Sequence, residues 1–216
     1  MPEQIRFYFD PLCPWCYQTS RWAKHLEASG EVSVDWRVFS LAIANKGDEG
    51  RAAPDSGSAP ALRVATLLRE RHGSAAAGRF YAAIGTAVHE RGEAADDPAV
   101  IERSLVEAGV DASLARDALR DPATWDAVQR EHDDVVARHH AFGVPTIVLE
   151  DDSVMFGPII VEVPEERDAV ELWRHFSWLA RNPNVAEIKR ERTEAPDLES
   201  VRRWRQRREQ EARGAA

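Results

Sequence analysis

Cys13 and Cys16 are the only cysteines of the chain, and Pro14 and Trp15 stand between them. One C-x-x-C pair cannot complete a zinc site by itself, because a structural zinc site needs four ligands. Two cysteines in 216 residues are also too few for a disulfide-stabilised scaffold. The spacing suits reversible dithiol oxidation, in which one thiolate attacks a disulfide and the second thiol resolves the mixed product. We therefore expect both cysteines to be catalytic.

The cysteine pair lies between a predicted strand and a predicted helix. Apolar and polar residues alternate from Ile5 to near Asp10, which is typical of a strand, and Pro14 suits the first turn of a helix. Cys13 would then meet the unpaired amides and the positive dipole end of that helix. We expect its pKa to fall from about 8.5 into the range ~3.5–7.5. Cys16 lies one turn deeper and is the expected resolving thiol.

The remaining pattern predicts the order of a thioredoxin fold. A second strand is expected at 32–38, followed by a loop rich in small and polar residues at 45–60. The chain then has helical periodicity up to Gly143. Two strands near 146–156 and a closing helix at 164–181 follow. This order predicts an α/β thioredoxin fold, β-α-β then β-β-α, with helices inserted between the two halves.

The predicted order divides the chain into three parts. We expect residues 1–45 and 142–190 to form the thioredoxin-like domain, residues 46–141 a helical insertion or lid, and residues 191–216 a charged tail. The arginine-rich tail is expected to be a solvated helix or a frayed end, with docking onto the protein or a second subunit as the alternative. The tryptophans on periodic apolar stripes are expected in the core: Trp22, Trp36, Trp125, Trp173 and Trp178.

A proline precedes the first of the two late strands, in the segment Gly143-Val144-Pro145-Thr146. The order of elements brings this segment near the cysteines and favours a cis peptide bond, a form found in about 5–6% of X-Pro bonds. It would turn the backbone of Val144 toward Cys13, where a substrate could pair with it as an extra strand. The alternative is an ordinary trans proline that begins a strand.

Several separated motifs together resemble the DsbA superfamily, and most closely its cytoplasmic, mycothiol-dependent nitroreductase-type branch. The similarity runs from about residue 5 to residue 197. The motifs that carry it are Phe9-Asp10-Pro11-Leu12-Cys13-Pro14-Trp15-Cys16, Ser40-Leu41-Ala42-Ile43-Ala44-Asn45, the Gly-Val-Pro-Thr segment, Phe156-Gly157-Pro158, and the late stretch from Ile188 to Pro196. Such a set in one order is far more specific than a C-x-x-C pair alone.

The resemblance implies a thioredoxin domain with a helical lid and mycothiol as the low-molecular-weight thiol. Cys13 would form a mixed disulfide with mycothiol or substrate, and Cys16 would resolve it. Trp15 and Asn45 would lie where substrate or thiol docks. The predicted binding residues are Pro14, Trp15, Asn45, Val144, Pro145 and Thr146. Trp15 replaces the histidine of the periplasmic oxidases, and no export signal is evident, so a role in oxidising secreted proteins is not expected.

Two further residues are candidates for acid–base chemistry. Asp10, just before the cysteine motif, could accept a proton from Cys16 through water, although a capping or loop role fits equally well. His132 shares one stripe of a predicted helix with His139 and could deprotonate a thiol. A histidine on an apolar stripe is more often a buried, hydrogen-bonded core residue, which is the favoured interpretation here.

The composition of the chain excludes several classes of protein. Apolar residues make up 44% and charged residues 30%, which is typical of a globular protein. No apolar run approaches the ~20 residues of a membrane-spanning helix, and no signal-peptide core follows Met1, so we expect a cytoplasmic protein. The net charge of −9 argues against nucleic acid as a partner. Monomer and homodimer are both compatible with the sequence.

The sequence thus predicts a cytoplasmic thiol–disulfide oxidoreductase. Its expected reaction is mycothiol-dependent reduction of a small electrophilic or nitroaromatic compound, with no metal and no tightly bound cofactor. One alternative is a general protein disulfide reductase or isomerase of DsbA type, which uses the same two thiols. Others are a non-catalytic thioredoxin-like binding protein and a structural metal half-site shared between two chains.

Overall fold

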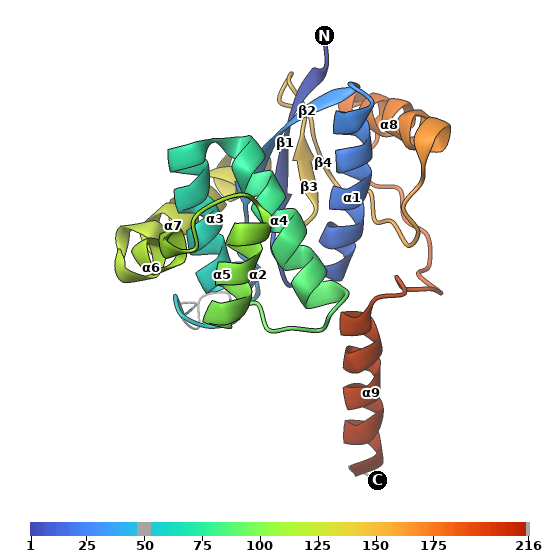
Figure 1. The fold of residues 1–216 in the computed structure, drawn as a ribbon. Helices are drawn as coiled ribbons and strands as arrows, with labels where there is room; N and C mark the ends of the chain where they lie inside the picture. The colour runs from blue at the N-terminus through green and yellow to red at the C-terminus, as the bar shows by residue number, and fades with distance from the viewer. Residues whose placement is uncertain (47–52, 215–216) are drawn as a thin grey trace.

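A four-stranded sheet in the order β2-β1-β3-β4 forms the centre of the fold (Figure 1). The computed structural model describes residues 1–46 and 53–214. Strands β1 (Glu3–Phe9) and β2 (Val32–Val38) are parallel, and helix α1 (Pro14–Ala28) connects them. Strand β3 (Thr146–Val148) runs antiparallel to β1, and β4 (Val154–Phe156) runs antiparallel to β3. This confirms the predicted thioredoxin arrangement.

The part of the chain between β2 and β3 is mostly helical. Those between β2 and β3 are α2 (Leu41–Lys46), α3 (Ala59–His72), α4 (Ser74–His89), α5 (Pro98–Glu107), α6 (Ser113–Arg120) and α7 (Ala123–His139). After the sheet come α8 (Glu166–Arg181) and α9 (Glu199–Gly214). Helices α3, α4 and α7 contact β2, and α8 packs on α1. None of the described helices is long and apolar enough to cross a membrane. The proposed division into three parts stays a prediction.

An aromatic cluster joins the sheet to α4. The rings of Phe9 and Tyr81 stack with their centroids 4.0 Å apart, and the rings of Phe7 and Trp36 are 5.0 Å apart. Gly78 allows this close packing, because a Cβ atom there would lie 2.5 Å from the Trp36 indole. The end of β1, and with it the start of the cysteine motif, is therefore fixed against the helical block.

Four of the five tryptophans expected in the core are buried, namely Trp22, Trp36, Trp125 and Trp173. The prediction for Trp178 is wrong, since its side chain is 63% exposed. Trp178 lies five positions after Trp173, which places it about 140° around α8 from the buried face. The helix itself lies where the sequence predicted it.

The predicted loop at 45–60 and the expected position of Asn45 need correction. Asn45 lies in α2 rather than in the predicted loop. Ser40 begins this helix, because its hydroxyl oxygen accepts a hydrogen bond from the Ile43 amide at 3.2 Å. Helix α3 begins at Ala59, one residue before the predicted end of the loop. Residues 47–52 of that prediction lie outside the described residues.

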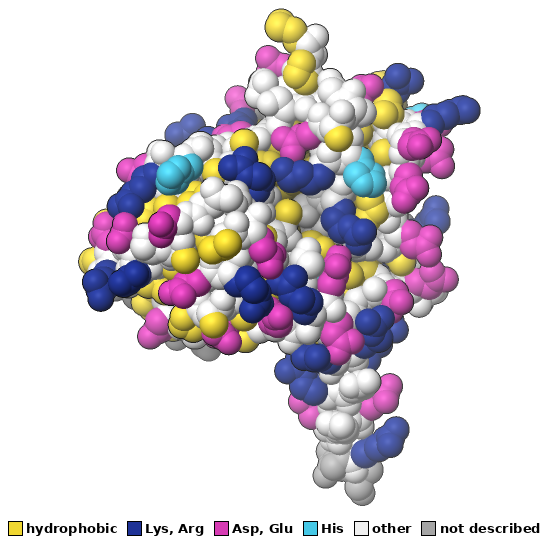
Figure 2. Space-filling view, viewed as in Figure 1, with side chains coloured by type: hydrophobic (Ala, Val, Ile, Leu, Met, Phe, Trp, Pro, Cys, Tyr) yellow, Lys and Arg dark blue, Asp and Glu magenta, His cyan; other side chains and the backbone are white. Residues whose placement is uncertain are grey.

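The charged tail forms helix α9. Its side chains are exposed from Arg202 to Arg213, and Figure 2 shows basic and acidic groups mixed along the visible face. The side chain of Leu198, just before the helix, is buried. The expectation of a solvated helix therefore holds for most of its length, whereas its beginning docks onto the protein.

Candidate active site

Cys13 occupies the N-cap position of α1, directly after β1. Its backbone is extended, and Pro14 stands in the first turn of the helix. The Cys13 sulfur accepts a hydrogen bond from the Cys16 amide at 3.4 Å. The same thiol donates to the Val144 carbonyl at 3.5 Å. The sulfur thus lies between the amides of α1 and the segment that precedes Pro145.

The expected low pKa of Cys13 is not found in this conformation. The residue is 8% exposed, and burial raises the pKa of its thiol to about 11. The amides of Cys16 and Trp15 lower the pKa, but they do not outweigh the loss of solvation. The predicted helix amides are present, but the sequence pattern did not indicate how deeply the Cys13 sulfur is buried. A thiolate at neutral pH requires Cys13 to gain solvent or a charged partner.

Cys16 lies deeper, as predicted for a resolving thiol. It is 0% exposed, and its thiol donates to the Tyr8 carbonyl at 3.7 Å. Burial raises the pKa of Cys16 well above its ordinary value, and a Cys13 thiolate would raise it further. The Tyr81 hydroxyl stabilises the Cys16 thiolate and so offsets part of this rise in the pKa of Cys16. Both cysteines are free thiols.

The Val144–Pro145 peptide bond is cis, as the sequence predicted. The Pro145 carbonyl accepts a hydrogen bond from the Gly157 amide at 2.8 Å, and the Thr146 hydroxyl donates to the Gly143 carbonyl at 2.7 Å. These contacts fix the segment so that the Val144 carbonyl faces Cys13. A second cis bond, between Gly157 and Pro158, was not anticipated from the sequence.

Asp10 is fully buried at the end of β1. Its carboxylate accepts hydrogen bonds from the Leu41 amide at 2.8 Å, the Ser58 hydroxyl at 2.9 Å and the Leu12 amide at 2.9 Å. Burial raises the pKa of Asp10 despite these three donors. The Asp10 charge raises the pKa of Cys13 and also that of Cys16, so the three groups are electrostatically coupled. Asp10 therefore ties the starts of α2 and α3 to the cysteine loop.

Comparison with known proteins assigns this chain to a family. The profile of the Rv2466c-like family, described as mycothiol-dependent nitroreductase Rv2466c, matches residues 12–190. The chain belongs to the Rv2466c-like family. This confirms the resemblance noted from the motifs.

Individual relatives agree with this assignment. The uncharacterized protein Rv2286c of Mycobacterium tuberculosis is 38% identical over 200 residues, which cover 91% of this chain and 85% of that protein. The structure of the cytosolic disulfide reductase DsbM from Pseudomonas aeruginosa with GSH superposes with a TM-score of 0.60 at 15% identity, covering 81% of this chain and 99% of that one. A probable DsbA oxidoreductase, SCO1869 from Streptomyces coelicolor, gives 0.53 at 23% identity over 91% and 97% of the chains. The structural matches confirm the fold.

In this Rv2466c-like chain, His132 is a buried core residue. Its Nδ1 atom accepts a hydrogen bond from the Ser40 amide at 3.3 Å, and its ring lies 4.3 Å from the Phe39 ring between centroids. Burial lowers the pKa of His132, so the ring is neutral at pH 7. Its contacts are with the residues that precede α2, which matches the favoured structural interpretation.

The remaining predicted binding residues differ in exposure. Pro14 and Trp15 are half-buried beside the sulfur, and Asn45 is exposed on α2. The Arg192 guanidinium lies over the Trp15 ring, with 5.5 Å between the guanidinium carbon and the ring centroid. Arg192 was not among the predicted site residues. Its only signal was its place within the late stretch that resembles the family.

His89 is a second residue that the sequence did not reveal. Its Nε2 atom lies 2.9 Å from the Pro11 carbonyl, and its Nδ1 atom lies 2.8 Å from the Ser200 hydroxyl. A carbonyl only accepts, so Nε2 carries the hydrogen and Nδ1 accepts from Ser200. Burial lowers the pKa of His89 to about 4, which keeps the ring neutral. His89 therefore connects the loop before Cys13 to the start of α9.

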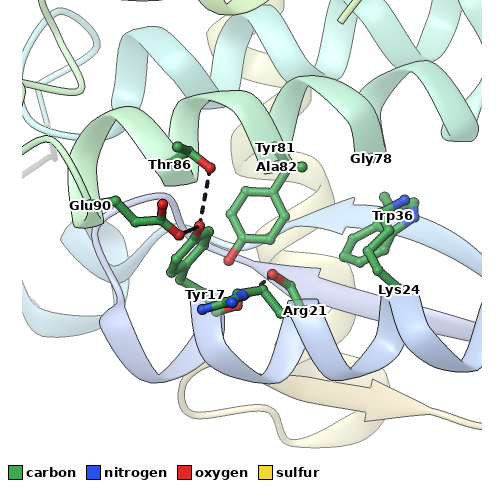
Figure 3. Close-up of a pocket in the computed structure, with 10 residues that line it drawn as sticks. Tyr17, Arg21, Lys24, Trp36, Gly78, Tyr81, Ala82, Thr86 and Glu90 are labelled. Carbon is green, nitrogen blue, oxygen red and sulfur yellow. Dashed lines mark hydrogen bonds between the residues drawn. The ribbon is translucent and has the colours of Figure 1, made fainter. Parts of the chain in front are cut away.

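A cavity of about 260 Å³ lies between α1 and α4 (Figure 3). Near one end the Tyr17 hydroxyl donates to Glu90 at 2.6 Å and lies 3.1 Å from the Thr86 hydroxyl, and Lys24 and Trp36 lie at the other end. Neither cysteine lines it, so it is separate from the candidate active site. Within the described parts of the chain, no cluster of three or more His, Cys, Asp or Glu residues could hold a metal ion.

Proposed function

We propose that this chain uses the Cys13–Cys16 dithiol to reduce small electrophilic or nitroaromatic compounds, with mycothiol as the electron donor. The observation that carries the proposal is the position of the Cys13 sulfur, between the first amides of α1 and the carbonyl before the cis proline. Family membership supports the choice of thiol and substrate class. The site of action is the cytoplasm, where a reducing thiol pool keeps the pair reduced.

Reduction of a nitro group by the dithiol balances as a two-electron step. The Cys13 and Cys16 thiols lose two electrons and two protons and form one disulfide. The nitro group becomes a nitroso group, and its released oxygen leaves as water with the two protons. Two mycothiol molecules then restore the dithiol and leave as oxidised mycothiol, through a mixed disulfide on Cys13.

Opening of the site to solvent activates Cys13. Exposure to solvent removes the desolvation that raises its pKa, whereas the Cys16 and Trp15 amides remain as donors. Pro14, Trp15 and Asn45 form one side of the docking face, and Val144, Pro145 and Thr146 form the other. The main chain of Val144 aligns the entering disulfide or nitro compound with the sulfur.

Asp10 accepts the Cys16 proton when this buried thiol closes the Cys13–Cys16 disulfide. Its raised pKa makes it a stronger base than an exposed carboxylate, and it is coupled to both cysteines. His132 is the less suitable base, because its Nδ1 lone pair is already engaged by the Ser40 amide.

Protein disulfide reduction is the second candidate function. It is favoured by the structural similarity to the cytosolic disulfide reductase DsbM. The depth of Cys13 argues against it, because a residue that is 8% exposed offers little surface to a disulfide held in a folded protein. A small thiol or a flat aromatic compound needs a far smaller opening.

A comparison of electron donors and acceptors tests the proposal. With a nitroaromatic acceptor, we expect mycothiol to support turnover at least about tenfold faster than glutathione at equal concentration, a difference of ~1.4 kcal/mol in transition-state binding. Insulin reduction should stay near its uncatalysed rate. Equal rates with both thiols, or insulin reduction as fast as nitro reduction, would instead support the protein disulfide reductase.

A further inference from the structure

The segment between α8 and α9 is attached to the cysteine loop. We call residues 185–203, which include the first turn of α9, the C-terminal strap. In Figure 1 the chain passes from α8 down beside α1, and α9 begins below the first turn of α1. The side chain of Leu198 is buried, and the Ser200 hydroxyl bonds to His89. His89 in turn bonds to the Pro11 carbonyl, two residues before Cys13. The strap is thus joined to the active-site loop through one neutral imidazole.

A second contact holds the strap to the loop that follows α4. The Arg203 guanidinium donates to the Gly92 carbonyl at 2.7 Å and also bonds to Glu199 at 2.6 Å within α9. Gly92 has a φ of +70°, and a Cβ atom there would lie 2.5 Å from the Arg203 guanidinium carbon. Only glycine allows this approach without displacement. Two independent contacts therefore fix the end of the strap nearest α9.

The strap places one cation beside the cysteines. The Arg192 guanidinium lies over the Trp15 ring, and Trp15 directly follows Pro14 in the motif. Arg192 forms no salt bridge with residues in the described ranges, so its charge is not neutralised by a carboxylate there. Guanidinium groups bind well to indole faces, and the contact orients Arg192 above the cysteine loop.

Several charges act on Cys13 from the surrounding elements. Asp10 at the end of β1 raises its pKa, and the charge of a Cys16 or Tyr81 anion would act in the same direction. Cys16 and Tyr81 are neutral at pH 7, because burial raises the pKa of each. Burial has the largest effect on the pKa of Cys13, and Arg192 is a cation that lowers this pKa. His89 is neutral and adds no charge to this balance.

We propose that Arg192 is a positioning residue, held over Trp15 by the C-terminal strap, that stabilises the thiolate of Cys13 against the buried charge of Asp10. The proposal deepens the proposed function, since it rests on Cys13 as the attacking thiol.

The pH dependence of Cys13 alkylation by iodoacetamide tests this role. The Cys16→Ser protein leaves Cys13 as the single thiol, and Arg192→Ala, Arg192→Lys and Arg190→Ala are added to it. We expect Arg192→Ala to move the midpoint upward by about 0.5 to 1 pH unit and to slow alkylation at pH 7 about two- to fourfold. Arg192→Lys should recover most of the shift. Arg190→Ala, which removes a neighbouring exposed charge on the same strap, should match the parent protein.

Added salt supplies a second readout. Raising the ionic strength to about 0.5 M should move the midpoint of the parent protein toward that of Arg192→Ala and leave Arg192→Ala nearly unchanged. Superposed profiles for Arg192→Ala and the parent would overturn the proposal. A downward shift in Arg192→Ala would also overturn it, because it would show that the residue only covers the sulfur. Alkylation needs neither mycothiol nor a nitro compound, so this result stands apart from the test of the proposed function.

Discussion

The Cys13→Ser protein should lose nitroreductase turnover by a factor of at least about 10³ in kcat/KM. A serine hydroxyl is not ionised at neutral pH and cannot form a disulfide, so neither the electron transfer nor the mixed disulfide with mycothiol remains possible. The fold should be unaffected, because serine is a favoured N-cap residue and Cys13 occupies that position in α1.

Steady-state turnover with a nitroaromatic acceptor and mycothiol measures this effect, and thermal unfolding provides the control. The melting temperature of Cys13→Ser should lie within a few degrees of the natural protein. If turnover persists at more than about a tenth of its natural rate in a folded Cys13→Ser protein, Cys13 is not the attacking group.

The largest effect on stability is expected at Arg63 in α3. Its side chain is 6% exposed, and its guanidinium donates to the Thr124 hydroxyl at 2.9 Å. It also donates to the Ala118, Leu119 and Asp121 carbonyls at the end of α6, at 3.0 to 3.1 Å, and to the Pro54 carbonyl before α3 at 3.2 Å. Arg63→Ala removes all of these hydrogen bonds at once, although the Ala118 and Asp121 carbonyls keep those from Thr124. We expect it to lower the free energy of unfolding by about 3 to 5 kcal/mol.

Urea unfolding of the reduced protein measures this loss. Arg63→Lys should restore only a small part of the lost free energy of unfolding, because one ammonium group cannot reach the same set of carbonyls. Arg71→Ala is the matched control from the same helix. Arg71 forms an exposed salt bridge with Asp117, so its removal should cost less than about 1 kcal/mol. A loss below 1 kcal/mol for Arg63→Ala would show that water replaces the guanidinium at these carbonyls.

Local patterns predicted the elements that carry the cysteine motif. Alternation from Ile5 onward and Pro14 after the motif placed β1 and the start of α1 correctly. The cis bond at Pro145 followed from the order of elements rather than from any single residue. Asn45 was misplaced because the loop-like composition begins at Asn45, whereas the helix that Ser40 caps continues through this residue to Lys46.

Properties that depend on distant contacts could not be predicted from the sequence. The pKa of Cys13 is set by the packing of residues that are remote in sequence, and the motif itself indicated only the favourable helix amides. His89 and Ser200 are 111 residues apart and share no local signal. Arg192 stands among charged residues that read as a solvated stretch. Its contact with Trp15 is evident only once the strap is placed beside α1.

The central claim is that Cys13 forms the mixed disulfide and Cys16 resolves it. Mass spectrometry of the Cys16→Ser protein after exposure to oxidised mycothiol tests this most directly. In this reaction the Cys13 thiolate displaces one mycothiol and retains the other. The account predicts one mycothiol adduct per chain, located on the peptide that contains Cys13, whereas the natural protein ends as a Cys13–Cys16 disulfide without adduct. An unmodified Cys13 in the Cys16→Ser protein, under conditions that oxidise the natural protein, would contradict the account.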